Sequence, residues 1–173
     1  MINPEVILVN DNDEVIGFED KLIAHQKGLK HRAISVLVFN TKGEWLMQQR
    51  AQHKYHSGGL WTNTCCSHPY PEETTQTSAE RRLMEEMGMK SKLSYVFDFS
   101  YCLKLDNDLT ENELDHVFIG KTDDLPNINK EEASDYRYVD TKTLKIELKD
   151  SPEKFTEWFK IIFAKVNEIN LKL

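Results

Sequence analysis

Residues suited to acid–base or metal chemistry gather in two stretches of the sequence that lie far apart. Residues 51–73 contain three of the six histidines and the adjacent pair Cys65 and Cys66, without a regular helix or strand period. Glu111 and Glu113, two positions apart, turn both carboxylates to the same side of an extended backbone. A thiol, imidazoles and paired carboxylates suit proton transfer or divalent-cation binding. We therefore expect the two stretches to supply one site.

A third stretch, residues 73–88, reads E-T-T-Q-T-S-A-E-R-R-L-M-E-E-M-G and resembles a Nudix box. The Nudix pattern is Gly, five residues, Glu, seven residues, Arg-Glu, an apolar residue, any residue, Glu-Glu, any residue, Gly. Two positions depart from it, because Ser67 replaces the opening Gly and Arg82 replaces the Glu that follows Arg. Nudix hydrolases hold divalent cations with clustered carboxylates. A cation at residue 82 instead favours the binding of a diphosphate.

Two further strings resemble the type 1 isopentenyl diphosphate isomerase family. They are W-T-N-T-C-C-S-H-P, from residue 61, and E-N-E, from residue 111, and the match extends from His25 to about Trp158. The resemblance implies a Nudix fold and the isomerisation of isopentenyl diphosphate to dimethylallyl diphosphate, by protonation of the alkene and loss of a proton from the opposite end. It makes Cys66 and Glu113 the catalytic pair, assisted by Tyr101, and leaves open which of the pair gives the proton.

This chemistry explains the residue types. An unactivated alkene needs one group to deliver a proton and another to remove one. The tertiary carbocation between these steps needs a dry pocket with aromatic walls, each worth roughly 0.5–2 kcal/mol per cation contact. Trp158 matches the aromatic position of the family, and Trp61 is a second candidate.

The resemblance also implies two metal sites and a set of phosphate-binding cations. The first metal is expected on three histidines and two glutamates, namely His25, His31, His68, Glu111 and Glu113. Such donors suit Mn²⁺ or Zn²⁺. A Mg²⁺ ion that bridges the diphosphate is expected on Glu86. The cationic positions that match the family are Lys21, Arg50, Lys54 and Arg82. His53, His56 and His116 match no ligand position and are expected to be ordinary polar residues.

Apolar runs and turn residues predict the elements that position these groups. Two hairpins are expected, over residues 6–18 and 33–49, and further strands over 93–105, 114–120 and 136–139. A helix is predicted from Thr74 or Thr75 to Met87, with Gly88 in the left-handed conformation after its end. A C-terminal helix is predicted to begin at Ser151 and Pro152. The order predicts an α/β (α+β) Nudix-type fold, in which helices cover both sides of a mixed sheet.

Bulk properties exclude several classes of protein. The 173 residues, 39% of them hydrophobic, predict one globular domain over residues 1–173. A net charge of −7 argues against a nucleic-acid surface. No run of 18 apolar residues and no signal-peptide pattern occurs, so we expect a cytoplasmic protein without a membrane partner. Its three cysteines are expected to be reduced, and a monomer or weak dimer is expected, with isopentenyl diphosphate as small-molecule substrate.

Two alternative functions compete with the isomerase hypothesis. A Nudix hydrolase of a nucleoside diphosphate derivative would share the fold and the Mg²⁺, but Arg82 in place of the box glutamate argues against it. A non-enzymatic module that binds a metal or nucleotide would have no use for a thiol and a carboxyl together with a complete ligand set. The isomerase is the reading that uses all three motifs.

Overall fold

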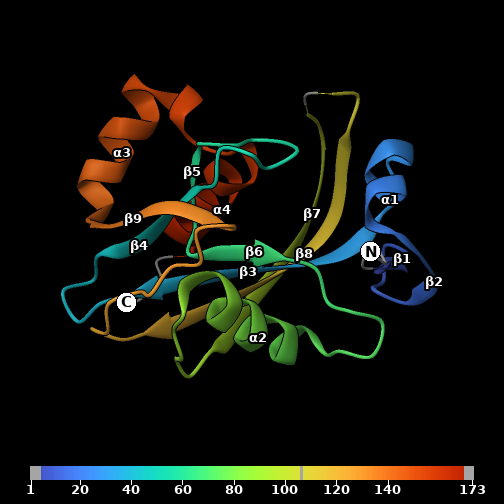
Figure 1. The fold of residues 1–173 in the computed structure, drawn as a ribbon, viewed down its shortest axis with the longest axis horizontal. Helices are drawn as coiled ribbons and strands as arrows, with labels where there is room; N and C mark the ends of the chain where they lie inside the picture. Colours follow the sequence, from blue (N-terminus) through green and yellow to red (C-terminus); the bar gives the residue numbers. More distant parts are fainter. Residues whose placement is uncertain (1–4, 106, 170–173) are drawn as a thin grey trace.

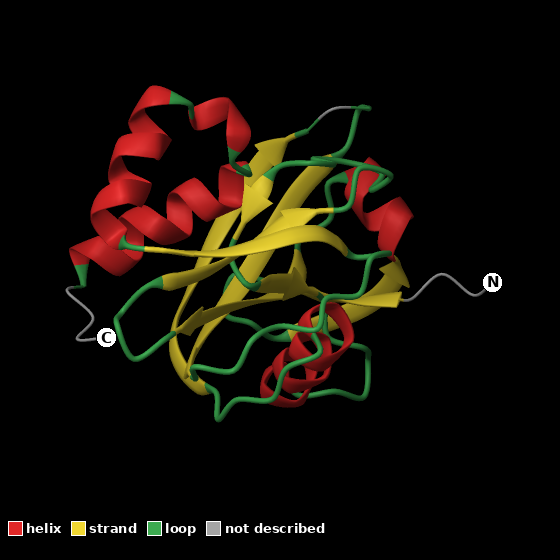
Figure 2. Ribbon diagram, turned by 60° about the vertical axis from the view of Figure 1, so that its left-hand side comes forward, coloured by secondary structure: helices red, strands yellow, loops and turns green. Residues whose placement is uncertain are grey.

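The computed structural model describes residues 5–105 and 107–169, which form a mixed β-sheet with helices on both faces (Figures 1 and 2). The strands are β1 (Glu5–Val9), β2 (Val15–Asp20), β3 (His31–Phe39), β4 (Trp45–Arg50), β5 (Trp61–Thr62), β6 (Cys65–Ser67), β7 (Ser94–Lys104), β8 (Thr110–Lys121) and β9 (Ala133–Val139). The helices are α1 (Lys21–Lys27), α2 (Thr75–Met87), α3 (Thr141–Asp150), the 3₁₀ turn η1 (Pro152–Lys154) and α4 (Glu157–Glu168). Within the described ranges, no helix is long and apolar enough to cross a lipid bilayer.

Strand β3 lies at the centre of the sheet. It pairs in parallel with β8 along its whole length, from His31 opposite Glu113 to Phe39 opposite Lys121. On its other side, residues 34–36 pair antiparallel with β6, which places Ser35 opposite Cys66. Because neighbouring side chains of a strand point to opposite faces, β3 contributes to two separate cores.

The two cores lie on opposite faces of the sheet, as the positions of the helices in Figure 2 show. On one face, Leu37 and Phe39 pack with the apolar side of α4, including Trp158, Phe159 and Ile162. On the other face, the alternate residues of β3 pack against α2; this core includes Ile34, Val36, Val38, Ala79, Leu83 and Met87. The predicted mixed sheet with helices on both sides is confirmed.

Helix α2 has the predicted ends. The Thr74 side chain accepts a hydrogen bond from the Thr77 backbone amide, and Thr77 bonds back to the Thr74 amide, which completes a capping box. Gly88 ends the helix at φ 62°, and a Cβ atom there would come within 2.4 Å of the Asn127 carbonyl oxygen. Glycine is therefore required by both backbone conformation and space.

The second predicted hairpin is only partly correct. Its two strands exist, but they pair only at Phe39 opposite Trp45 and then diverge. The gap is filled by β5, which pairs with β4, and by β6, which pairs with β3. These two short strands belong to residues 51–73, where no strand was predicted. Two- and three-residue strands carry too little alternation to be recognised in a sequence.

The C-terminal helix begins later than predicted. Pro152 opens the short 3₁₀ turn η1, Phe155 is extended at φ −119° and ψ 149°, and Thr156 is the residue before the first turn of α4. Ser151 therefore caps no part of α4, although the predicted apolar side of that helix is buried. Helices α1 and α3 were not predicted; the N-cap side chains that start them are Asp20 and Asp140.

Candidate active site

One pocket receives residues from both faces of the sheet, since Trp158 belongs to α4 and Arg82 and Glu86 belong to α2. It is lined by eleven residues that the sequence singled out: Lys21, Arg50, Lys54, Cys66, His68, Arg82, Glu86, Tyr101, Glu111, Glu113 and Trp158. His25 and His31 are completely buried next to Glu113. Strands β6 and β8, which flank β3, thus bring Cys66 and Glu113 to one pocket from its two sides.

The adjacent cysteines point to opposite faces of the sheet. Cys65 is completely buried in the core beneath α2, whereas the half-buried Cys66 packs at the edge of the α4 core and lines the pocket. The segment that carries them is held by side chains. Thr64 accepts a hydrogen bond from the Val38 amide and donates one to the Leu46 carbonyl, which ties it to β3 and β4. Cys66 is therefore the one of the two adjacent cysteines that the pocket can use.

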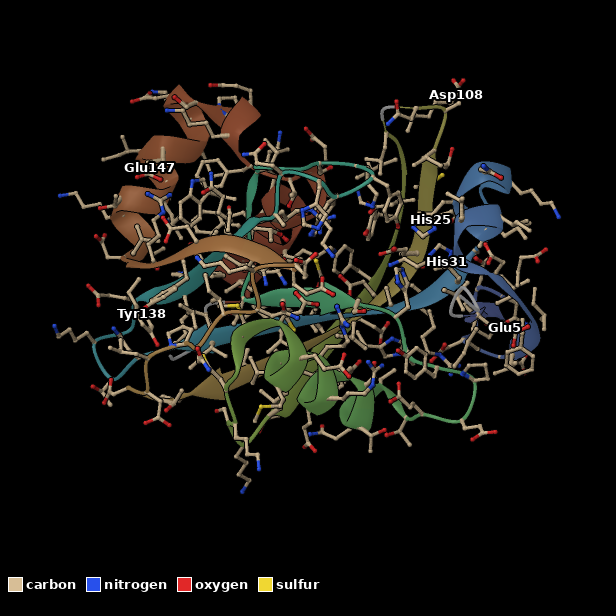
Figure 3. The ribbon with its side chains drawn as sticks, viewed as in Figure 1. Glu5, His25, His31, Asp108, Tyr138 and Glu147 are labelled. Carbon is tan, nitrogen blue, oxygen red and sulfur yellow. The ribbon has the colours of Figure 1, made fainter. Side chains whose placement is uncertain are left out.

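His25, His31, His68 and Glu113 form a cluster that we call the imidazole end of the pocket. Two of its members, His25 and His31, are labelled in Figure 3 and lie close together, with ring centres 4.8 Å apart. Glu113 Oε1 lies 2.9 Å from Nε2 of His68, 3.4 Å from Nε2 of His31 and 4.0 Å from Nε2 of His25. The four residues come from α1, β3, β8 and the segment after β6. Tertiary structure therefore brings together four of the five expected metal ligands.

Backbone contacts fix the protonation of two of these rings. The Nδ1 atoms of His25 and His31 each lie 2.7 Å from a carbonyl oxygen, of Lys21 and Leu29 respectively. Because a carbonyl only accepts, both Nδ1 atoms carry the proton and both Nε2 atoms present lone pairs. Nε2 of His25 is buried and has no hydrogen-bond partner among the described residues. A cation bound by this donor set would satisfy it.

Burial keeps the imidazoles of His25 and His68 uncharged. It lowers the pKa of His25 to about 4, aided by neighbouring His31, and it holds the pKa of His68 well below its usual value, aided by Lys21. A metal ligand must be the neutral imidazole, so no proton has to leave these rings at neutral pH. The residues present therefore fit a divalent transition metal.

Glu111 and Glu113 share a tyrosine but differ in their surroundings. Tyr101 donates to Glu113 over 2.5 Å and lies 3.4 Å from Glu111, so its hydroxyl bridges the two carboxylates. Burial and the charge of Glu113 raise the pKa of Glu111. Burial alone would also raise the pKa of Glu113, but the neighbouring His31 and His68 rings outweigh it and lower this pKa. Glu111 groups with His25 and His56 rather than with the four-residue cluster.

The opposite side of the pocket, which we call the cation end, consists of Lys54, Arg82, Glu86 and Glu132. Arg82 contacts Glu86 Oε1 at 2.7 Å and Glu132 Oε1 at 3.2 Å, and Lys54 forms an ion pair with Glu132. The other oxygen of Glu86 accepts from Gln48 at 2.9 Å. Arg82 and Glu86 are four residues apart and therefore lie on the same side of α2.

Two other expected phosphate-binding residues approach this end. Burial lowers the pKa of Lys21, and the nearby charges of Arg82, Arg50 and Lys54 lower it further. An adjoining hollow shares Lys21, Lys54, Arg82 and Glu132 with the pocket. Positive charges thus converge between the two spaces, where an anionic group would offset their repulsion.

The two predicted aromatic walls lie in different places. Trp158 is buried and lines the pocket. The guanidinium of Arg50 lies over its ring, 5.2 Å from the ring centre. Trp61 instead stacks with Arg137, 4.5 Å from its ring centre, and lines a separate hollow near α3. The reason is strand alternation, because the neighbouring Thr62 side chain is buried and bonded to Asn63. The placement of Trp61 in the pocket was wrong.

Three residues that sequence reasoning passed over lie in or beside the pocket. His56 was expected to be an ordinary polar residue, but it is buried, lines the pocket and places Nε2 3.7 Å from Glu111. Asp115 is buried below Ser35, which donates to it over 2.8 Å, and burial and Glu113 raise its pKa to about 8. Its position two residues after Glu113 was a usable signal. For His56 and Glu132 the sequence offers no such signal.

His53, His116 and Glu85 behave as ordinary polar residues. His53 is exposed and lies 3.5 Å from Glu131, and His116 pairs with Asp13 at 3.0 Å on the far side of β8. Glu85 is exposed and pairs with the arginines of α2. The solvated reading of this carboxylate therefore agrees with its geometry.

Comparison with known proteins identifies the family. The chain matches the NUDIX domain over residues 29–159. It is 51% identical over 162 residues to the isopentenyl-diphosphate Delta-isomerase of Pectobacterium atrosepticum, covering 94% of this chain and 90% of that protein. Isopentenyl-diphosphate Delta-isomerase 1 of Aromatoleum aromaticum is 47% identical, with 94% and 92% covered.

A solved structure supports the fold. The MutT protein of Methanosarcina mazei superposes with a TM-score of 0.68 at 19% identity, covering 83% of this chain and 96% of that one. At this identity the likeness concerns the fold alone. Together with the two relatives, the domain match leads to one conclusion: the chain belongs to the isopentenyl-diphosphate Delta-isomerase family and carries a Nudix domain.

Proposed function

We propose that this protein isomerises isopentenyl diphosphate to dimethylallyl diphosphate by adding a proton at one end of the allylic unit and removing one at the other. The single observation that carries the mechanism is that a thiol, Cys66, and a carboxyl, Glu113, line one pocket from the two strands that flank β3. The names of the relatives support the same reaction.

Cys66 and Glu113 are suited to the two proton transfers of the reaction, one to the substrate and one from it. Burial raises the pKa of Cys66 to about 12, so the thiol holds its proton at neutral pH. Glu113 faces the Tyr101 hydroxyl at 2.5 Å, which orients the carboxyl and offers it a proton path within the pocket. The isomerisation consumes no net proton, because the substrate gains one proton and loses another. After product release, proton exchange with solvent returns both residues to their starting protonation states.

The aromatic side chains of the pocket serve the carbocation. Tyr55, Tyr101 and Trp158 line it, and Trp158 is fixed by its place in α4. An electron-rich ring beside a tertiary cation stabilises it by roughly 0.5–2 kcal/mol per contact. Exclusion of water by the same rings prevents its capture as an alcohol.

The two ends of the pocket divide the remaining tasks. His25, His31, His68 and Glu113, with Glu111 nearby, would hold Mn²⁺ or Zn²⁺, and Glu86 would hold a Mg²⁺ that accompanies the diphosphate. When bound, the first ion supplies positive charge beside Glu113 and the second neutralises phosphate oxygens. Lys21, Arg50, Lys54 and Arg82 bind and orient the diphosphate itself, which fixes the alkene between Cys66 and Glu113.

Hydrolysis is not favoured as an alternative. The position at which a Nudix hydrolase carries another carboxylate is Arg82, whose guanidinium is occupied by Glu86 and Glu132. Simple hydrolysis also has no use for the Cys66 thiol.

The test is proton NMR of the purified, metal-supplemented protein with isopentenyl diphosphate in heavy water, with released phosphate followed in the same tube. We expect dimethylallyl diphosphate that carries solvent deuterium, without phosphate release. An unchanged alkene in the presence of Mg²⁺ and either Mn²⁺ or Zn²⁺ would refute the proposal and direct attention to nucleoside diphosphate derivatives.

A further inference from the structure

Glu132 occupies the centre of the cation end, although it belongs to none of the sequence motifs. Its carboxylate forms an ion pair with Lys54 and lies 3.2 Å from Nη2 of Arg82. It lines both the pocket and the adjoining hollow, and only 22% of its side chain is exposed. A carboxylate in a site for an anion is unexpected on electrostatic grounds alone, and so requires a reason.

The backbone holds Glu132 and Lys54 in a fixed relation. The Glu132 carbonyl accepts from the Ala51 amide at 3.0 Å, and the Ala51 carbonyl accepts from the Lys54 amide at 3.2 Å. Between β4 and β9, Gln49 pairs with Asp135 and Arg50 pairs with Ala133. Ser134 of β9 is therefore an extra residue, and it brings Glu132 level with Ala51. The ion pair between Glu132 and Lys54 is therefore supported by main-chain bonds on both sides.

Glu132 is charged in the folded protein. Burial alone would raise its pKa, but Arg82 and Lys54 outweigh burial and lower it. Without this carboxylate, Lys54 would keep a flexible four-carbon stem beside the like charge of Arg82. Such a stem loses considerable rotamer freedom when an anion immobilises it.

We propose that Glu132 is a positioning residue that orders Lys54 and Arg82 before the diphosphate arrives, an inference that rests on the proposed function. Arg82 is held from two sides, by Glu86 on its own helix and by Glu132 across the pocket mouth. Lys54 is held by Glu132. The anion then meets donors that are already aimed, and the ordering cost is met during folding rather than during binding.

The test compares Glu132→Gln with Glu131→Gln, its matched neighbour. The Glu131 side chain is 85% exposed and lies 3.5 Å from the exposed His53, so its substitution controls for the loss of one charge. Binding of inorganic pyrophosphate at fixed Mg²⁺ is measured by isothermal titration, and KM and kcat are measured with isopentenyl diphosphate. For Glu132→Gln we expect about tenfold weaker pyrophosphate binding, a similar rise in KM and a kcat within about twofold of the parent. Glu131→Gln should match the parent.

A double-mutant cycle separates positioning from a merely structural role. In a Lys54→Ala background, Glu132→Gln should cost less than tenfold, because one of the two side chains that it orders is absent and the other, Arg82, is still held by Glu86. Equal losses in both backgrounds, or unchanged or tighter pyrophosphate binding by Glu132→Gln, would overturn the inference. If Glu132→Gln does not fold, as judged by circular dichroism, Glu132→Asp replaces it: one methylene shorter, it should reach only one of its two partners and show an intermediate loss.

The two proposals fail in different ways. A parent protein that binds pyrophosphate but does not isomerise isopentenyl diphosphate would refute the proposed function, and the cycle would still decide the role of Glu132. A parent protein that binds no pyrophosphate would overturn the positioning role directly.

Discussion

The two ends of the pocket are built by different kinds of contact. At the imidazole end, backbone carbonyls orient His25 and His31, and burial lowers the pKa of His25 to about 4. At the cation end, side chains orient one another through ion pairs, as Arg82 does with Glu86. Main-chain contacts hold a ligand set in one geometry, whereas charged side chains that are ordered by ion pairs can bind an anionic substrate and release it again. The first arrangement suits a resident ion and the second suits a substrate that must leave.

The largest expected effect comes from the two residues proposed to transfer protons, Cys66 and Glu113. Cys66→Ala and Glu113→Gln should each lower kcat by about 10³-fold or more, because each removes a proton-transfer group from a reaction with no other activation. Cys65→Ala is the control for the thiol and should retain activity. Turnover is measured by NMR, and circular dichroism confirms the fold. Near-parental activity of either variant would remove that residue from the mechanism.

Metal removal should affect the imidazole end next. Chelation should abolish activity and lower the thermal midpoint, since an ion at about 100 times its Kd stabilises the folded state by about 2.7 kcal/mol. His68→Ala should lose most of this metal-dependent stabilisation, measured by scanning calorimetry with and without Mn²⁺ or Zn²⁺. His116→Ala, on the far side of β8, is the matched control. An equal response of the two variants to metal would contradict the assignment of the ligands.

A smaller effect separates the two tryptophans. Trp158→Phe keeps a ring but weakens its cation contact, so kcat should fall by roughly 2- to 30-fold, which corresponds to about 0.5–2 kcal/mol per contact. Trp61→Phe should leave kcat unchanged, because its ring faces Arg137 in a separate hollow. A fall in kcat for Trp61→Phe equal to that for Trp158→Phe would show that the hollow near α3 communicates with the reaction.

The smallest effect concerns the pairs on α2 outside the pocket. Burial alone would raise the pKa of Glu73, but hydrogen bonds from Arg81, at 2.5 and 2.7 Å, outweigh it and lower this pKa. A depressed carboxyl pKa gives stability that is present above the unfolded value of 4.5 and is lost as pH falls through the folded value. Glu73→Gln should therefore cost about 1 kcal/mol at pH 7, and less as pH falls below 4.5. Urea unfolding at several pH values measures this difference, and a constant cost would contradict the ion pair as its source.

Sequence patterns predicted the parts of the fold that depend on local chemistry. Helix α2 was located because its cap Thr74 and its terminating Gly88 lie next to it in the chain. The seven residues of α1 are too few to show a helical period, and α3 was missed with its short apolar stripe. The start of α4 was misplaced because Pro152, a common first residue of a helix, here begins a separate 3₁₀ turn.

Within the pocket, the residues that match a motif or a family position were predicted, whereas His56 and Glu132 match neither. His56 and Glu132 reach the pocket only through tertiary structure, one from a loop and the other through the extra residue Ser134 in β9. Trp61 was misplaced for the opposite reason, since closeness to Cys66 in sequence does not decide the side of a strand to which a ring points.

The parallel pairing of β3 with β8 determines when the site can form during synthesis. His31 and Glu113 are direct neighbours in the sheet, but the whole segment between them in the chain must be synthesised before they can meet. Such non-local pairs form late, and nascent chains fold as their segments emerge. The histidines of a chain still on the ribosome therefore lack their carboxylate partner. We expect the ion to be acquired only after β8 has emerged, so that metal supply limits the maturation of finished chains rather than their translation.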